Sequence, residues 1–224
     1  TNGTEQRQTN AEAIAEVNGR FNLSGLPVLL FVGQINWKKN ILRILEAAAL
    51  LKKSGAAFKL VLAGQGPDAE AIVKKAHSLG LEEQLVMTGM IGDTRTLDAL
   101  YSRADLFVFP SLYDTFSLVI REAAAMDTPS VAVEGSCAAE SITHGVNGYL
   151  CQDSTDSLYQ AIREALDNPE RARAIGLEAH RTIPVSWEEV IKDAARRYES
   201  LAERFVCHPR ASHLRYQRKK RKNP

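Results

Sequence analysis

The chain has 224 residues, of which 45% are hydrophobic and 25% charged, and 28 Lys and Arg against 27 Asp and Glu give a formal net charge of +1. This composition is typical of a globular domain and excludes disorder as the state of the whole chain. No run approaches the roughly 18 apolar residues of a membrane-spanning helix, and the first residues lack the apolar stretch of a signal peptide, so a cytoplasmic location is expected. Cys137, Cys151 and Cys207 are scattered and fit neither a disulfide framework nor a metal knuckle, so we expect reduced thiols.

The charge is unevenly distributed along the chain. Residues 206–224 hold seven Lys and Arg and no acid, which leaves 21 basic and 27 acidic residues in 1–205. An acidic body argues against a nucleic-acid-binding domain, because such a domain needs a basic stripe on its folded surface. Two interpretations of the tail remain open: a solvated, flexible end, or attachment to an anionic membrane surface at roughly 1 kcal/mol per basic side chain.

Short apolar runs alternate with segments of helical periodicity over most of the chain. Strands are expected within 27–35, 58–64, 85–89, 106–111, 129–135 and 148–152. Helices are expected over 11–17, 40–55, 68–80, 94–104 and 116–126, then over 154–181 and 186–205, with Pro169 and Pro184 marking interruptions. Strands this uniformly apolar are buried on both faces, so the alternation predicts the α/β class and a doubly wound parallel sheet of about six strands, followed by C-terminal helices.

Ligands of such sheets bind beyond the carboxyl ends of the strands. After the first strand, GQINWKKN (33–40) places a glycine, two lysines and a helix start together, where a phosphate would fit; a plain loop with solvated lysines is the alternative. After the second strand, GQGP (64–67) lacks the third glycine of a dinucleotide fingerprint, so no nicotinamide cofactor is indicated. A Walker loop is also missing, which leaves ATP hydrolysis without support.

The loop and the helix after the fourth strand carry two acids that are eight residues apart, Asp114 and Glu122. Residues 114–117 lead into a helix whose free amides would bind a diphosphate, and Asp114 would meet whatever lies beyond the phosphates. Glu122 lies about one and a half turns inside that helix, where a carboxylate can accept both vicinal hydroxyls of a ribose. A helix cap and a surface acid are the alternative interpretations of the same two residues.

Other catalytic patterns are missing from the sequence. There is no H-E-x-x-H, G-x-S-x-G or D-x-D, so neither a metal-bound nor a serine-nucleophile mechanism is indicated. His77, His144 and Cys137 have no local partner that fixes a catalytic role, and we expect the two histidines to be structural.

Taken in order, GQINWKKN, LVLAGQGP, TGMIGD and ADLFVFPSLYDTFSLVIREAAAMDTPSVAVEGSCAAESITHGVNGYL resemble the C-terminal, nucleotide-sugar-binding domain of retaining GT-B glycosyltransferases of family four. The resemblance covers roughly residues 1–205, and Asn2-Gly3 matches the N-G that usually enters this domain. It implies a Rossmann-like donor-binding domain over 1–205 and a basic tail over 206–224. The N-terminal domain, which supplies the acceptor site in that family, is expected to be missing from this sequence.

The resemblance assigns the first set of site residues. Lys39 matches the lysine of the G-R-x-x-x-x-K-G motif that begins at Gly33 and contacts the donor diphosphate. Gln34 stands where that motif has arginine, which removes one cation, and Asn40 replaces the glycine after the lysine. The glycine turn and the stretch whose backbone meets the nucleobase are matched by Gly64, Gly66, Met90 and Ile91.

The second set comes from the loop after the fourth strand. Glu122 matches the second acid of the E-x-x-x-x-x-x-x-E motif and is implied to hold the ribose, while Asp114 replaces the first acid with a side chain one methylene shorter and is implied to face the donor sugar. The loop whose amides meet phosphate and sugar is matched by Thr115, Phe116 and Ser117. Glu140 matches the acid of G-G-x-x-E, with Ser136 in the place of a glycine.

The mechanism implied by the resemblance is transfer with retention of anomeric configuration, without a metal or other cofactor. Lys39 and the helix N-terminus would stabilise the departing nucleoside diphosphate, Asp114 would orient the sugar, and a glycan or lipid-linked acceptor would arrive from the missing domain. UDP-sugar is the expected donor, because the family most often uses uridine. The changes at Gln34 and Asp114 motivate an alternative, a non-catalytic nucleotide-sugar-binding module; a GT-B epimerase is a further alternative.

Overall fold

The computed structural model describes residues 7–114 and 117–206, the last three by their backbone alone. It confirms the α/β class with a six-stranded, all-parallel sheet in the order β3-β2-β1-β4-β5-β6. The strands are β1 (Val28–Val32), β2 (Lys59–Ala63), β3 (Leu85–Gly89), β4 (Leu106–Phe109), β5 (Ser130–Val133) and β6 (Tyr149–Cys151). Each lies inside the range that the sequence predicts for it.

Helices connect and cover the strands. They are α1 (Ala11–Phe21), α2 (Ile41–Lys53), α3 (Ala69–Ser78), α4 (Thr94–Arg103), α5 (Leu118–Ala125), α6 (Thr155–Asp167) and α7 (Pro169–Thr182). All of these and the sheet belong to one compact unit, Thr4–Pro184, whereas α8 (Trp187–Val206) belongs to a second unit and is described by itself.

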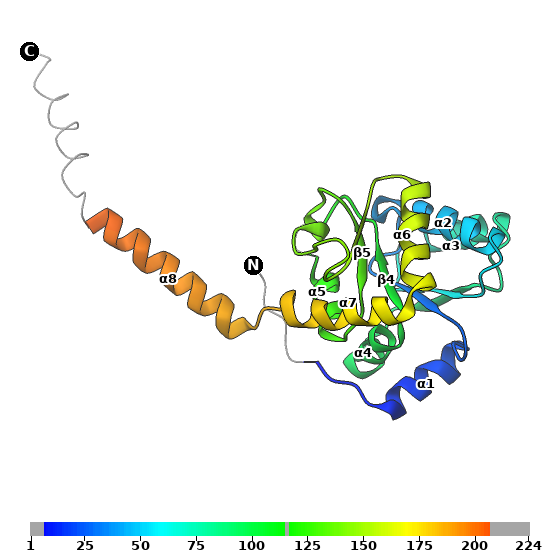
Figure 1. The fold of residues 1–224 in the computed structure, drawn as a ribbon, viewed down its shortest axis with the longest axis horizontal. Coiled ribbons are helices and arrows are strands. Elements are labelled where there is room, and N and C mark those ends of the chain that lie inside the picture. The colour runs from blue at the N-terminus through cyan, green and yellow to red at the C-terminus, as the bar shows by residue number, and fades with distance from the viewer. Residues whose placement is uncertain (1–6, 115–116, 207–224) are drawn as a thin grey trace, which may run out of the picture. The chain divides into compact units, whose positions relative to one another are not determined.

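The order of the strands creates a switch point between β1 and β4. From β1 the chain proceeds outward to β2 and β3, and then crosses back to β4 on the other side of β1. Because such crossovers are right-handed, the helices that connect β1, β2 and β3 lie on one face of the sheet, and the helices that connect β3, β4 and β5 lie on the other. Accordingly α2 contacts α3 and α6, whereas α4 contacts α1 and α5, and α5 contacts α7. Figure 1 shows α6 next to α2 and α1 next to α4.

The central strands are buried because both faces are covered by helices. Val28, Leu29, Leu30 and Phe31 of β1 and all four residues of β4 are buried. The rings of Phe31 and Phe109 stack with their centroids 5.8 Å apart, joining the two strands that flank the switch point. A rigid, apolar support therefore lies directly beneath the loops that follow β1 and β4.

Several predicted boundaries shift for local reasons. The predicted helix over 154–181 is divided into α6 and α7 because Pro169 occupies the first position of α7. The helix predicted over 116–126 begins at Leu118, since Ser117 has a left-handed backbone conformation. Two short 3-10 helices, Trp37–Lys39 and Cys137–Ala139, are present that the sequence analysis does not predict.

Helix α8 is amphipathic, and four of its larger apolar side chains are exposed: Trp187, Ile191, Tyr198 and Leu201. Its polar side chains form local ion pairs, including Lys192 with Glu188 at 2.6 Å and Arg197 with Asp193 at 2.7 Å. Among the helices that the structure describes, none is both long and apolar enough to cross a membrane. The predicted basic tail lies outside the described residues, apart from the backbone of Val206.

Two of the three cysteines are described, and both are free thiols, as expected; Cys207 lies outside the described residues. Cys137 is exposed, whereas Cys151 is buried in β6 and its Sγ lies 3.5 Å from the carbonyl oxygen of Ala132. Burial raises the pKa of the Cys151 thiol to about 12. Since the thiolate is the reactive form, this thiol stays protonated and unreactive at neutral and mildly alkaline pH.

We therefore predict that a Cys137→Ser/Cys207→Ser variant, which keeps only Cys151, releases almost no chromophore from a disulfide reagent at pH 8 while folded. With a pKa of about 12, roughly one thiol in ten thousand is ionised at that pH. The same variant in denaturant should react with one equivalent. Stoichiometric reaction of the folded variant at pH 8 would contradict the burial of Cys151.

Candidate functional site

The loops that follow β1, β2 and β3 are joined side by side at the carboxyl edge of the sheet. The Gly33 N–H donates to the Ala63 carbonyl at 3.0 Å, and the Gly64 N–H donates to the Gly89 carbonyl at 2.9 Å. The Ile35 N–H donates to the Gln65 carbonyl at 3.0 Å, which extends the pairing beyond the strands. The predicted glycine loops therefore form one continuous rim rather than separate turns.

Two glycines in this rim are required by close packing. A Cβ on Gly64, whose φ is +142°, would lie 1.9 Å from the carbonyl oxygen of Gly33. A Cβ on Gly66 would lie 2.1 Å from the carbonyl oxygen of Ile35. Both contacts are far inside van der Waals distance, so only glycine lets the loop after β2 approach the loop after β1 this closely.

A cavity of about 260 Å³ opens beside this rim. Its lining consists of Val32, Gly33, Gln34, Ala63, Gly64, Gln65, Met90, Ile91 and Leu97. Five of these are predicted site residues from three different loops, namely Gly33, Gln34, Gly64, Met90 and Ile91. The walls are mainly apolar and backbone, which suits a flat heterocycle held by main-chain groups.

The structure brings Lys39 and Asp114 together across the switch point. The Lys39 Nζ lies 2.9 Å from the Asp114 Oδ2 and also donates to the Tyr113 carbonyl at 3.3 Å. Both side chains are about one-fifth exposed, so the ion pair is reachable from solvent. Asn36 begins the turn that holds Lys39, since its Oδ1 accepts from the Lys39 N–H at 3.1 Å, and Gln34 accepts from the Asn36 amide at 2.7 Å.

Ser117 gives the N-terminus of α5 an unusual shape. Its φ of 43° and ψ of 47° are left-handed, a conformation that L-residues other than Asn and Asp rarely adopt. Its N–H donates to the Asp114 Oδ1 at 3.3 Å, and its buried Oγ has no hydrogen-bond partner among the residues that the structure describes. The predicted neighbours Thr115 and Phe116 lie outside the described residues.

Glu122 is held in a network of side chains one turn inside α5. The Arg7 Nη2 lies 2.6 Å from its Oε1, and the Tyr101 hydroxyl donates to its Oε2 at 3.0 Å. The Arg7 Nη1 lies 2.7 Å from the Oδ1 of the buried Asp98. Burial, reinforced by the Glu122 carboxylate, raises the pKa of Tyr101 well above its usual value, so the Tyr101 hydroxyl remains a donor.

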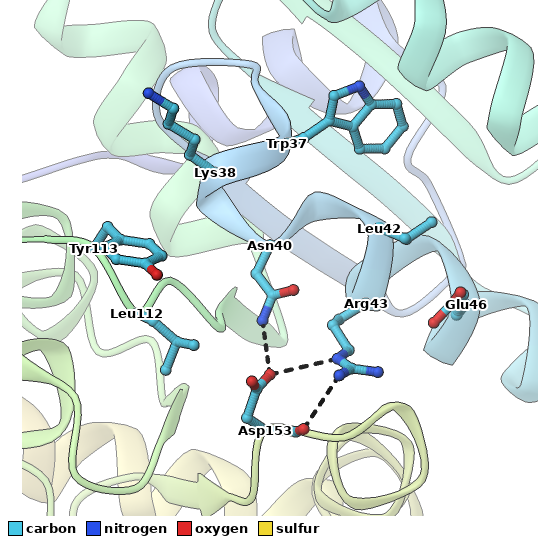
Figure 2. A pocket seen from close by; sticks show the side chains of 9 residues that line it. All are labelled: Trp37, Lys38, Asn40, Leu42, Arg43, Glu46, Leu112, Tyr113 and Asp153. Carbon is cyan, nitrogen blue, oxygen red and sulfur yellow. Dashed lines mark hydrogen bonds and ion pairs between the residues drawn. The ribbon is translucent and has the colours of Figure 1, made fainter.

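A second cavity, of about 300 Å³, has residues of the Lys39 turn in its lining. Figure 2 shows its lining: Trp37, Lys38, Asn40, Leu42, Arg43, Glu46, Leu112, Tyr113 and Asp153. Asn40 and Arg43 both donate to the Asp153 Oδ1, at 3.1 and 3.4 Å. Asn40 has a φ of 61° and thus adopts the left-handed conformation that the motif's glycine would favour.

The remaining residues that the sequence analysis considers for the site lie outside the two cavities described above. The His144 Nδ1 accepts from the Leu150 N–H at 3.0 Å, which fits the structural role expected for this residue, and His77 is exposed on α3. Glu140 is exposed at the end of the 3-10 helix Cys137–Ala139. Within 7–114 and 117–206, no group of three or more His, Cys, Asp or Glu is arranged to hold a metal ion.

Four residues around the site carry no motif by which the sequence would predict them: Arg7, Leu97, Asp98 and Tyr101. Arg7 lies 115 residues before Glu122, and Asp98 and Leu97 are ordinary residues of a predicted helix. Their involvement follows from the packing of α4 against α5 and of the N-terminal segment against both, for which the local sequence carries no signal.

Comparison with known proteins agrees with this geometry. Residues 16–182 match the family model for glycosyl transferases group 1. The chain is 31% identical to alpha-D-kanosaminyltransferase of Streptomyces kanamyceticus over 70% of this chain and 40% of that protein. It is 30% identical to alpha-monoglucosyldiacylglycerol synthase of Streptococcus pneumoniae over 90% of this chain and 42% of that protein.

The fold is shared with Anabaena Alr3699/HepE, whose crystal structure contains UDP and glucose; the TM-score is 0.75 at 21% identity, over 90% of this chain and 56% of that one. The chain spans less than half the length of the two curated relatives. With the family model matching most of the residues that form the sheet and the site, the chain belongs to the glycosyl transferases group 1 family.

Proposed function

We propose that this chain is the donor-binding domain of a retaining glycosyltransferase, which transfers a sugar from a UDP-sugar to a glycan or lipid-linked acceptor. The cavity of about 260 Å³ carries the proposal, because five residues predicted from separate loops line it together. It opens at the carboxyl edge of the sheet, where ligands of doubly wound folds bind.

The base, the ribose and the diphosphate of the nucleotide would each bind to a different part of the site. The base enters the cavity and meets the backbone of Met90 and Ile91, while Glu122 accepts the ribose hydroxyls. The diphosphate lies against Lys39 and the free amides that begin α5, both of which favour a developing anion. Asp114, already paired with Lys39, then lies at the sugar end, and the protein groups alone supply the positive charge that the leaving group requires.

The relatives support the choice of substrates. Anabaena Alr3699/HepE was crystallised with UDP and glucose, which favours uridine as the base here. The streptococcal relative is named a monoglucosyldiacylglycerol synthase, which supports a lipid-linked acceptor as one of the two acceptor classes. The acceptor would bind in a part of the whole protein that these residues do not form.

One observation favours a second candidate, a nucleotide-sugar-binding module without transfer activity. Gln34 supplies no cation where the family motif has arginine, and its side-chain oxygen bonds to Asn36 instead. Acceptor-dependent release of UDP from UDP-glucose by the whole protein would exclude the module, and tight donor binding without any turnover would favour it.

The proposed function predicts selective nucleotide binding. In calorimetric titrations with UDP, GDP and ADP, we expect saturable binding of UDP, weakened by about 1–3 kcal/mol in Glu122→Ala because the ribose loses a charged acceptor. Glu82→Ala, an exposed acid at the opposite edge of the sheet, serves as the matched control and should bind like the wild type. Absence of binding, or equal binding by Glu122→Ala, would contradict the assignment.

A further inference from the structure

Arg7 connects the N-terminal segment to two helices of the candidate site. It lies outside every helix and strand, yet its side chain is only 17% exposed and forms ion pairs of 2.7 Å with Asp98 on α4 and 2.6 Å with Glu122 on α5. A planar guanidinium presents donors in a fixed fork, so bridging two carboxylates also fixes the position of each. The contact therefore attaches the N-terminal segment to α4 and α5 and also constrains the orientation of Glu122.

The bonds to Glu122 leave its carboxylate half occupied. Among the residues that the structure describes, Arg7 takes one acceptor position on Oε1, and Tyr101 takes one on Oε2. A carboxylate has about four lone-pair positions, so the described residues leave one position on each oxygen. Because the Glu122 side chain keeps 20% of its surface exposed, these two positions are reachable. Two acceptor positions side by side on one fixed plane match two vicinal hydroxyl groups.

We propose that Arg7 is a positioning residue for nucleotide binding: it holds the Glu122 carboxylate in the orientation that accepts the 2′- and 3′-hydroxyls of the ribose. The inference rests on the proposed function, in which Glu122 binds the ribose. Arg7 acts through Glu122 and does not itself touch the nucleotide. Asp98 anchors the other side of the guanidinium, so the bridge from α4 to α5 fixes the plane.

The test compares UDP with 2′,3′-dideoxy-UDP, which keeps the base and the diphosphate but lacks both hydroxyls. For wild type, we expect the dideoxy compound to bind about tenfold more weakly than UDP, the effect of losing hydrogen bonds to a charged group. For Arg7→Ala, we expect the dissociation constant for UDP to rise by about tenfold and that for dideoxy-UDP to change less than twofold. The variant thus loses the preference for the hydroxyls and nothing else.

Arg103→Ala is the matched control. Arg103 is similarly buried, with 16% exposure, and also fastens the N-terminal region to α4, through the carbonyls of Leu23 and Leu26 at 2.8 and 2.6 Å. It makes no hydrogen bond or ion pair with Glu122 in the part of the chain that the structure describes. It should keep the full preference for UDP over dideoxy-UDP, even where its melting temperature falls.

Arg7→Ala leaves the buried Asp98 without its cation, which can destabilise the fold. The double variant Arg7→Met/Asp98→Asn removes both charges together and is expected to show the same loss of preference, with its melting temperature as the check on folding. If Arg7 variants weaken UDP and dideoxy-UDP by the same factor, or change neither, the inference is overturned while the proposed function stands. If wild type binds neither compound, the proposed function fails, and the inference with it.

Discussion

Gly64→Ala is expected to lower the free energy of unfolding by roughly 3–5 kcal/mol, among the largest effects of a single methyl group in this chain. The added Cβ would lie 1.9 Å from the Gly33 carbonyl oxygen, and Gly64 has a φ of +142° that alanine does not adopt without strain. Because the obstacle is backbone rather than a flexible side chain, the two loops must separate. Chemical denaturation measures the change.

The matched control is Gly19→Ala in α1, where a Cβ meets nothing within 4 Å. Alanine is favoured over glycine inside a helix, so this variant should be more stable by about 0.5–1 kcal/mol. Replacing glycine by alanine is thus predicted to lower the free energy of unfolding at position 64 and to raise it at position 19. A Gly64→Ala protein that unfolds at the wild-type denaturant concentration would show that the loops after β1 and β2 do not pack as described.

Lys39→Met is expected to weaken UDP binding by about 1.5–3 kcal/mol and to leave uridine binding nearly unchanged. The reason is that the Lys39 ammonium lies 2.9 Å from the Asp114 carboxylate, which in turn accepts from the Ser117 N–H just before α5 at 3.3 Å, so its charge acts where the diphosphate is proposed to bind. Uridine lacks the diphosphate, so its binding reports on the cavity alone. Calorimetry with the two ligands separates the contributions.

Lys38→Met is the control for this substitution. Lys38 is adjacent in sequence and exposed, but it lines the second cavity beside Tyr113 instead of pairing with Asp114. It should reduce UDP binding by no more than the few tenths of a kcal/mol typical of an exposed charge. Equal losses in the two variants would mean that only the general positive charge of the loop matters. A loss of uridine binding in Lys39→Met would place Lys39 near the base instead.

The sheet was predictable because each strand is a short, uniformly apolar run. The burial of β1 and β4 on both faces follows from runs such as VLLFV and LFVF, and the separate helix groups follow from the order of the strands. The division at Pro169 was also visible in the sequence. The 3-10 turn at Trp37–Lys39 was not, since it depends on the Asn36 side chain accepting from the Lys39 N–H.

The site was predictable wherever it is built from loops that directly follow strands. Gly33, Gly64 and Met90 line one cavity because three parallel strands end at the same edge. The loop motifs contain no signal for the surroundings of Glu122, which depend on Arg7 and Tyr101 reaching it from distant parts of the chain. Ser117 is intermediate: its place in the motif was evident, but its left-handed backbone was not.

Donor binding at the carboxyl edge of the sheet is tested most directly by mapping UDP onto the chain through amide chemical-shift changes. We predict that the largest changes fall on Gly33, Gly64, Met90 and Ile91, which line the cavity beside the glycine loops, and on Ser117, the N-cap of α5. Changes confined to the second cavity, around Trp37 and Tyr113, or to helix α8, would contradict it.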